Sequence, residues 1–141
     1  MATVFTMIIN GDIPGRFVWR DERAVAFLTI NPVSTGHTLV VPIDEVDHWA
    51  DLDPDLAAHL FAVAHVVAKA QMEAFAPERI ALLIAGFEVP HTHLHVMPAN
   101  GIRDTSLEYA GATPDAAELD AAAEAIRAAL RAMGRAEVPA S

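Results

Sequence analysis

Three histidines occupy every second position in the run His91-Thr92-His93-Leu94-His95. Side chains of an extended strand point alternately to its two faces, so this spacing predicts a strand with all three imidazoles on one face. Consecutive rings would then lie roughly 6.5–7 Å apart along the strand. Because imidazole can act as a nucleophile, an acid, a base or a metal ligand near neutral pH, the run indicates a chemical site built on a sheet.

The segments around this run predict an α+β fold with a five-stranded antiparallel sheet and two main helices. Strands are expected over residues 17–20, 24–30, 38–42, 80–84 and 91–97, and a short helix over residues 5–9. Asp53 and Pro54 are typical of a helix start, and the helix that they open should end at Pro77. Thr113 and Pro114 open the second main helix.

The chain of 141 residues is long enough to bury one core and is expected to form a single domain. Residues 1–98 form its core, which ends with the histidine strand. A loop over residues 99–112 leads to the C-terminal helix over residues 113–134, and residues 135–141 form a tail.

The charge balance restricts the possible partners. Nine basic and 19 acidic residues give a net charge of −10, which argues against binding of a nucleic acid polymer and leaves a small anionic ligand possible. The absence of cysteine excludes disulfides, thiolate zinc sites and a cysteine nucleophile. The first ten residues have neither the basic region nor the long apolar run of a signal peptide or membrane anchor. A cytoplasmic protein without a membrane partner is therefore expected.

The middle histidine is the best candidate for a nucleophile. Such a histidine must present one unprotonated ring nitrogen while an acceptor holds the other. His93 has an imidazole on each side to orient it, to donate to a developing oxyanion or to move a proton. Phosphorus is a suitable electrophile, because water can discharge the phosphoramidate that forms.

The run resembles the signature of the histidine triad (HIT) family, in which histidines alternate with hydrophobic residues. Residues 5–14, 26–32 and 36–42 are similar to further family segments in the same order, which is more specific than one short motif. The similarity is to the Hint-like and Fhit-like nucleotide hydrolases. It implies a hydrolase or transferase that cleaves at the α-phosphate of nucleoside monophosphate conjugates, such as phosphoramidates or dinucleoside polyphosphates, through a nucleotidyl-histidine intermediate.

The resemblance also implies a role for each histidine of the site. His93 would become nucleotidylated, His91 would orient it, and His95 would contact the phosphate and help to handle the proton of the leaving group. His37 would reach the site from the neighbouring strand. The implied substrate-binding residues are Phe5, Ile8, Phe27, Leu28, Thr29, Ile30, Glu88 and Val89. Family members need no metal or other cofactor for the chemical step. They typically form homodimers with one sheet running through both subunits, so a symmetric dimer is expected.

The chain departs from the family pattern at three places, which are Thr29, the stretch over residues 86–90 and Thr92. Thr92 is polar where the signature prefers an apolar residue, and the loop between Ile84 and His91 is several residues shorter than usual. Thr29 stands where an Asp or Asn usually holds the ribose hydroxyls, and its single hydroxyl cannot make the same bidentate contact. Phe87 and Glu88 fall where many members carry polar residues that meet the phosphate. Phe87 cannot donate a hydrogen bond, and Glu88 would repel a phosphate if it pointed inward. These departures affect the expected substrate rather than the histidine chemistry.

Two alternatives remain open at this level. The domain could bind nucleotides without turnover, since Thr29, Phe87 and Glu88 are altered. The histidines of residues 91–95 could instead hold a metal, with His37 as the fourth ligand of a closed site. His93 is expected on a solvent-facing surface, and no chemical role is assigned to the remaining histidines, which are His48, His59 and His65.

Overall fold

The computed structural model describes residues 2–141, so Met1 of the predicted domain lies outside the described residues. The elements are α1 (Val4–Ile9), β1 (Phe17–Arg20), β2 (Ala24–Leu28), β3 (Thr38–Pro42), α2 (Pro54–Phe75), β4 (Arg79–Leu83), β5 (Leu94–Ala99) and α3 (Ala116–Ala132). Short 3-10 helices occupy Trp49–Asp51, Ile102–Thr105 and Leu107–Tyr109. The last two lie within the segment that was expected to be a loop.

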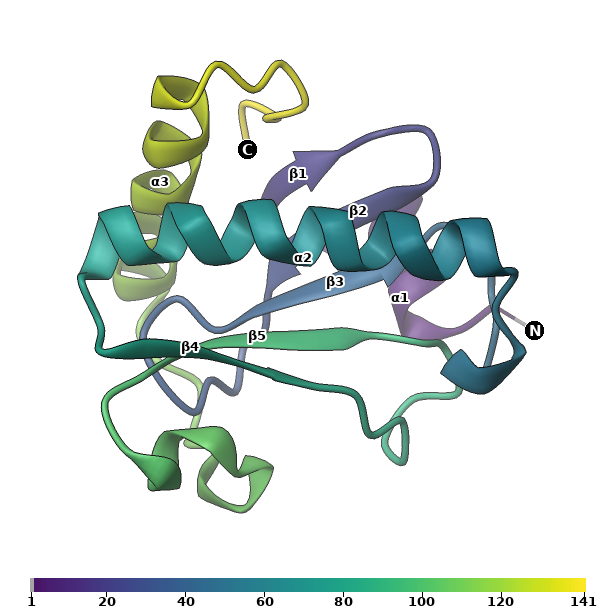
Figure 1. The fold of residues 1–141 in the computed structure, drawn as a ribbon, viewed down its shortest axis with the longest axis horizontal. Coiled ribbons are helices and arrows are strands. Elements are labelled where there is room, and N and C mark those ends of the chain that lie inside the picture. Colours follow the sequence, from purple (N-terminus) through teal and green to yellow (C-terminus); the bar gives the residue numbers. More distant parts are fainter. Residues whose placement is uncertain (1) are drawn as a thin grey trace.

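The five strands form one antiparallel sheet in the order β1-β2-β3-β5-β4, which confirms the predicted fold class. The long α2 lies across one face of the sheet with α3 beside one of its ends, and α1 lies on the other face (Figure 1). β5 lies between β3 and β4. The strand that carries part of the histidine run is therefore an interior strand.

Alternation along the strands divides the buried side chains between the two faces. Ala26 and Leu28 of β2 pack in the cluster beneath α2 and α3, whereas Phe27 packs with α1. Leu94 and Val96 of β5 also belong to the cluster beneath α2 and α3. The side chains between them in β5 therefore face α1, and this places the histidine site on the α1 face.

The signals at both ends of α2 act as predicted. The Asp53 side chain accepts a hydrogen bond from the backbone N–H of Asp55 (3.2 Å), and Pro54 takes the first helical position. The helix ends at Phe75, where Ala76 adopts a left-handed conformation with φ of 47° immediately before Pro77. Among residues 2–141, neither α2 nor any other helix has both the length and the apolar character needed to cross a membrane.

Several predicted boundaries are wrong. α1 begins and β4 begins and ends one residue earlier than predicted, and α3 ends at Ala132 rather than at residue 134. β2 ends at Leu28 rather than at residue 30, because Thr29 already turns toward the next strand and its N–H donates to the carbonyl of His37 (3.3 Å). α3 begins at Ala116 because Asp115, and not Thr113, occupies the N-cap position.

The predicted strand over residues 91–97 is displaced, since β5 runs from Leu94 to Ala99. Pairing with β3 ends at the Val40 and Leu94 pair. Upstream of that pair, the N–H and hydroxyl of Thr92 both donate to the carbonyl of Val46 (2.7 Å each) instead of joining the ladder. His91 and His93 therefore precede the paired strand.

Candidate active site

The predicted histidines gather where β5 begins, on the α1 face of the sheet. The ring centroids of His93 and His95 are 4.9 Å apart, and those of His37 and His95 are 5.2 Å apart. His37 reaches His95 because it precedes β3, which pairs with β5. All three rings and that of His91 are buried, with at most 6% of each residue exposed. The predicted solvent-facing position of His93 is therefore wrong, since the Phe5 ring packs 4.9 Å from its ring centroid.

Hydrogen bonds fix which nitrogens of His37 and His95 carry protons. The backbone N–H of Val33 donates to Nδ1 of His37 (3.1 Å), so the proton of neutral His37 lies on Nε2. This Nε2–H donates to Nδ1 of His95 (3.0 Å), which places the proton of neutral His95 on its own Nε2. That buried atom has no hydrogen-bond partner within residues 2–141. His95 thus keeps a free donor in the site.

His93 is held with the opposite polarity. Its Nδ1–H donates to the carbonyl oxygen of His91 (2.7 Å), so Nε2 of neutral His93 carries a lone pair. His91 is fixed in turn, because its Nε2–H donates to the carbonyl of Pro42 (2.7 Å) and its Nδ1 accepts from the hydroxyl of Thr3 (2.7 Å). A lone pair on His93 and a donor on His95 therefore lie side by side.

Burial keeps three of these rings neutral. Desolvation, and then the nearby His95 and His93, lowers the pKa of His37 to about 3. Desolvation and His93 lower the pKa of His95 to about 4, while Glu88 acts in the opposite direction. Desolvation also lowers the pKa of His91, against the effects of its bond to a backbone carbonyl and of a nearby carboxylate. These rings are therefore uncharged at neutral pH.

Buried Gln71 of α2 connects the helix-covered face with the site. Its Nε2–H₂ donates to the carbonyls of Gly36 (3.0 Å) and Val96 (2.9 Å), which adjoin His37 and His95 in sequence. Gly36 has φ of 89°, and a Cβ at this position would collide with the Phe75 ring. The two hydrogen bonds of Gln71 and the packing of Phe75 on Gly36 fix the backbone next to His37 and His95, whose rings are hydrogen-bonded to each other.

A pocket of about 250 Å³ opens between α1 and β2. It is lined by Val4, Phe5, Ile8, Ile13, Pro14, Gly15, Arg16, Phe27, Leu28, Thr29, Ile30 and Leu39. Six of the eight residues predicted to bind substrate belong to this lining, all from residues 5–30. Phe5 lies both in the pocket wall and against His93, so the pocket adjoins the histidine site. Its mostly apolar wall suits a flat aromatic group.

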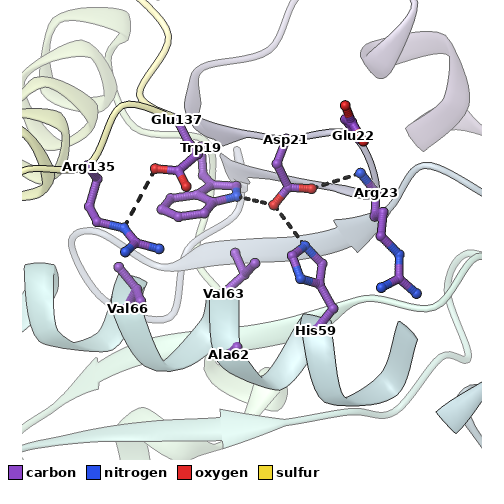
Figure 2. A pocket seen from close by; sticks show the side chains of 10 residues that line it. All are labelled: Trp19, Asp21, Glu22, Arg23, His59, Ala62, Val63, Val66, Arg135 and Glu137. Carbon is purple, nitrogen blue, oxygen red and sulfur yellow. Dashed lines mark hydrogen bonds and ion pairs between the residues drawn. The ribbon is translucent and has the colours of Figure 1, made fainter. Parts of the chain in front are cut away.

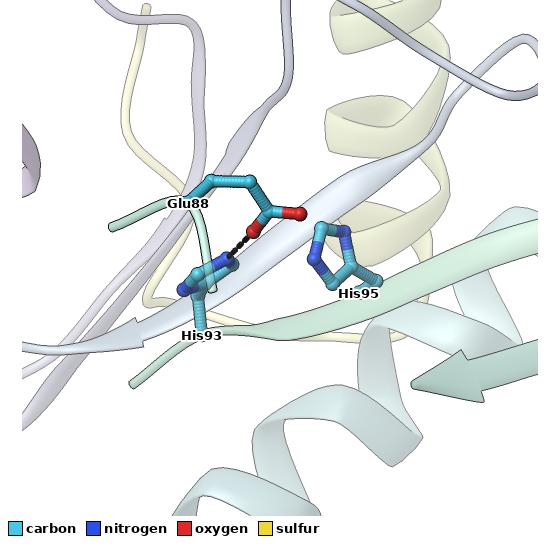
Figure 3. Close-up of side chains that lie close together, drawn as sticks. All are labelled: Glu88, His93 and His95. Atoms are coloured by element: carbon cyan, nitrogen blue, oxygen red, sulfur yellow. Dashed lines mark ion pairs between the residues drawn. The ribbon is translucent and has the colours of Figure 1, made fainter. Parts of the chain in front are cut away.

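The other two predicted residues, Glu88 and Val89, lie outside this pocket. Glu88 comes from the loop between β4 and β5 and points inward, with Oε2 3.5 Å from Nε2 of His93 (Figure 3). Val89 packs against the apolar cluster beneath α1. Phe87 is 95% exposed and contributes nothing to the buried site.

The geometry does not bring the four histidines together as metal ligands, because both ring nitrogens of His91 are hydrogen-bonded elsewhere. The donor atoms that do converge, within 4.8 Å of one another, belong to Glu88, His93 and His95. For His95 to bind a metal through Nε2, its proton would have to move to Nδ1 and face the Nε2–H of His37. A metal at this position would therefore break the hydrogen-bond chain.

Sequence reasoning missed the residues that hold His91. The Thr3 hydroxyl bonds to its ring, and Glu45 accepts hydrogen bonds from the Thr3 N–H (2.8 Å) and the Thr6 hydroxyl (2.5 Å). Thr3 is recognisable in the sequence as the N-cap of a short helix. Its contact with His91, 88 positions away, depends on the tertiary fold, and no local sequence pattern predicts it.

A second pocket, of about 400 Å³, lies between α2, the β1–β2 turn and residues 135–137 (Figure 2). There the Asp21 carboxylate accepts hydrogen bonds from the Trp19 indole (2.7 Å) and the backbone N–H of Arg23 (2.8 Å), and it contacts Nε2 of His59 (2.8 Å). Burial opposes ionisation of Asp21, but these bonds outweigh it and lower its pKa. The polar groups satisfy one another, so this cluster fastens α2 to the turn.

Comparison with known proteins agrees with this architecture. The HIT domain model matches residues 10–102. The chain is 36% identical over 106 residues to "Protein hit" of Bacillus subtilis, covering 72% of this chain and 73% of that protein. It is 32% identical over 103 residues to adenosine 5'-monophosphoramidase hnt1 of Schizosaccharomyces pombe, covering 70% and 74%. The crystal structure of a Zn-bound histidine triad family protein from Mycobacterium smegmatis superposes with a TM-score of 0.82 at 29% identity, covering 95% and 96%. The chain therefore belongs to the histidine triad (HIT) family.

Proposed function

We propose that this protein is a nucleotide hydrolase that cleaves the bond between the α-phosphate of a nucleoside 5'-monophosphate and its leaving group. The observation that carries the proposal is the opposed polarity of two adjacent rings, a lone pair on Nε2 of His93 and a proton on Nε2 of His95. The first can attack phosphorus, and the second can donate to the group that departs. The relative named as a monophosphoramidase supports this reaction class.

In the first step, the Nε2 lone pair of His93 forms a bond to the α-phosphorus. The bond from phosphorus to the leaving nitrogen or oxygen breaks, and its electron pair stays with the leaving atom. Nε2–H of neutral His95 donates a hydrogen bond to that atom, which takes up its proton from solvent, so His95 stays uncharged. The product is a nucleotidyl group on His93, whose Nδ1–H still donates to the carbonyl of His91.

In the second step, water attacks the phosphorus, and the bond to His93 breaks with its electron pair returning to Nε2. One proton of this water is released to solvent, and the hydroxyl remains on the nucleoside monophosphate. His37 and His91 act as positioning residues, since each holds a neighbouring group without facing the phosphorus. No metal or other cofactor takes part in either step.

The apolar pocket beside Phe5 is the proposed site for the base. Its volume of about 250 Å³ and its position against His93 allow a nucleoside to lie there with its phosphate over the histidines. Thr29 would meet the ribose with one hydroxyl, which already accepts a hydrogen bond from the backbone N–H of Asn31 (3.2 Å). A single contact would hold the ribose less tightly than a bidentate carboxylate.

A symmetric homodimer is the proposed assembly, with β4 of one subunit beside β4 of the other. β4 is an edge of the sheet, and its Leu82 is exposed. Phe61 and Met72 lie about three turns apart on α2 and are exposed as well, so the proposed interface would bury apolar surface of both elements. Light scattering coupled to size exclusion tests this assembly, and a monomer at micromolar concentration would contradict it.

The decisive experiment is to trap the covalent adduct. The protein is mixed with adenosine phosphoramidate, adenosine phosphosulfate or a dinucleoside polyphosphate, quenched with acid-free denaturant and measured by intact mass. The expected result is a gain of one nucleotidyl group, mapped to His93 in the wild type and missing in His93→Gln. Release of nucleoside monophosphate without any adduct would contradict the mechanism, and the absence of both would contradict the activity.

A nucleotide-binding protein without turnover is a second candidate, favoured by one observation. The Glu88 carboxylate lies 3.5 Å from Nε2 of His93, in the space that a substrate phosphate needs. If this side chain never leaves, nucleotides would bind only with the phosphate turned away. Binding of adenosine monophosphate without hydrolysis of any of the three conjugates would support this candidate.

A further inference from the structure

Glu88 covers the histidine site from an exposed loop between β4 and β5. Its side chain is about half exposed, and its carboxylate turns back over His93 and His95 (Figure 3). One nitrogen of each ring and one carboxylate oxygen lie within 4.8 Å of one another. Within residues 2–141, the approach to His93 is the only polar side-chain contact of this carboxylate. It is therefore positioned over the reacting atoms and weakly held there.

A substrate must displace this carboxylate, but it cannot displace it far. A phosphorus atom poised for attack lies about 3–3.5 Å from the nucleophile, which is the space that Oε2 of Glu88 now fills. Both groups are anionic, so they cannot share this space. In-line attack places the leaving group opposite His93, on the side of the loop. Because its backbone tethers it there, the withdrawn carboxylate would lie beside the leaving group.

Within the described residues, no Lys or Arg side chain pairs with Glu88, whose one ion-pair contact is with His93. Desolvation lowers the pKa of both His95 and His91, and the carboxylates of Glu88 and Glu45 oppose this effect at His95 and His91, respectively. A nearby Lys or Arg would lower these pKa values, and within residues 2–141 none is among the groups that do so for His37, His91 or His95. Arg16, at the nucleoside pocket, is engaged by Asp120 at 2.7 Å. An anionic leaving group would therefore meet an uncompensated carboxylate, and a cationic one would meet an ion-pair partner.

We propose that Glu88 makes the site selective for nucleoside phosphoramidates whose amine leaving group carries a second, positively charged group. The inference rests on the proposed function and defines its substrate class. In the free protein the carboxylate occupies the phosphate position. In the complex it pairs with the cation of the leaving group, and polyanionic leaving groups such as nucleoside polyphosphates are disfavoured.

Three adenosine 5'-phosphoramidates of nearly equal size test the proposal, made with ethylenediamine, propylamine and β-alanine. Their leaving groups carry a positive, a neutral and a negative end. We expect kcat/KM of the wild type to fall in that order, by at least tenfold from first to last. Glu88→Gln should reduce this ratio to less than threefold, mainly by a gain on the β-alanine compound. Glu73→Gln, an exposed position on α2, changes the net charge equally and should keep the wild-type ratio.

The outcomes separate this inference from the proposed function. Equal efficiency on all three compounds, or an unchanged order in Glu88→Gln, would overturn the selectivity while the hydrolase activity stands. If none of the compounds releases adenosine monophosphate, the proposed function falls. Calorimetric binding of the same compounds then decides the role of Glu88. Tightest binding of the cationic compound, lost in Glu88→Gln, would support it, and equal affinities would refute it.

Discussion

The two faces of the sheet are both buried, but their burial serves different ends. Beneath α2 and α3 the buried residues form one large apolar cluster, which gains stability from the removal of apolar surface from water. Beneath α1 a smaller apolar cluster adjoins four buried histidines. Buried imidazoles need hydrogen-bond partners, so this face is specified by polar geometry rather than by volume. The face beneath α2 and α3 stabilises the sheet, and the face beneath α1 determines which histidine nitrogens carry protons.

The largest expected effect is the loss of activity in His93→Gln. Glutamine has a similar size and can still donate to the carbonyl of His91, but it offers no nitrogen lone pair to phosphorus. We expect kcat to fall by about four orders of magnitude or more, with a small change in stability. Steady-state release of nucleoside monophosphate and thermal unfolding measure the two effects. A variant that retains a hundredth of the activity would show that His93 is not the nucleophile.

Acidification should lower the stability of the protein through the buried histidines of the α1 face. His37 and His95 have pKa values of about 3 and about 4 in the folded protein and about 6.5 when unfolded. Below pH 6.5 the unfolded chain therefore binds protons that the folded protein refuses, and the stabilising effect is fully present only above that pH. Between pH 6.5 and 5 we expect a loss of about 3 kcal/mol in the free energy of unfolding.

Urea unfolding at several pH values measures this loss. His65→Asn removes an exposed histidine from α2 and should leave the slope unchanged. His37→Asn removes one of the two depressed groups and should reduce the slope by about half. A wild-type stability that is constant from pH 6.5 to 5 would contradict the burial of these rings as neutral species.

A truncation on the opposite face should cost stability and spare the chemistry. Leu60 of α2 is fully buried in the apolar cluster beneath that helix. Leu60→Ala should lower the free energy of unfolding by about 3 kcal/mol, through lost apolar burial and the cavity left behind. The kcat per folded molecule should stay within twofold of the wild type. A larger change in kcat would mean that the helix-covered face also tunes the site.

The apolar side of this comparison is largely predictable from the sequence. β1 and β3 have the predicted boundaries, and the start of α2 follows from Asp53 and Pro54, since local alternation and capping determine these elements. The predicted start of β5 is wrong because the N–H and hydroxyl of Thr92 bond to the carbonyl of Val46, beyond the end of β3, instead of joining the ladder. The local alternation of side chains is the same for a residue that pairs in the sheet and for one that bonds outside it, so the sequence does not distinguish them.

The chemistry of the site is predictable from the sequence, but the residues that support the histidines by hydrogen bonds are not. The alternating histidines identify the ring that would react, and the family pattern identifies half of the residues that line the apolar pocket. The tautomers depend on Val33 and Thr3, which bond to His37 and His91 from other parts of the chain. The inward direction of Glu88 depends on a loop with no regular structure. Such contacts arise only when the tertiary fold brings the segments together.

The smallest expected effect tests one of these supports. Thr3→Val keeps the shape of the side chain and removes the hydroxyl that donates to Nδ1 of His91 and accepts from the Thr6 N–H (3.1 Å). Loss of the cap and of the buried bond should lower the free energy of unfolding by about 1 kcal/mol. Because the carbonyl of His91 holds the proton on Nδ1 of His93, kcat should fall about fivefold while KM stays unchanged. Thr3→Ser keeps the hydroxyl and should retain the wild-type kcat. If the Ser and Val variants have the same kcat, the Thr3 hydroxyl caps α1 without influencing the nucleophile. The orientation of His93 would then depend on His91 and not on the residue that bonds to it.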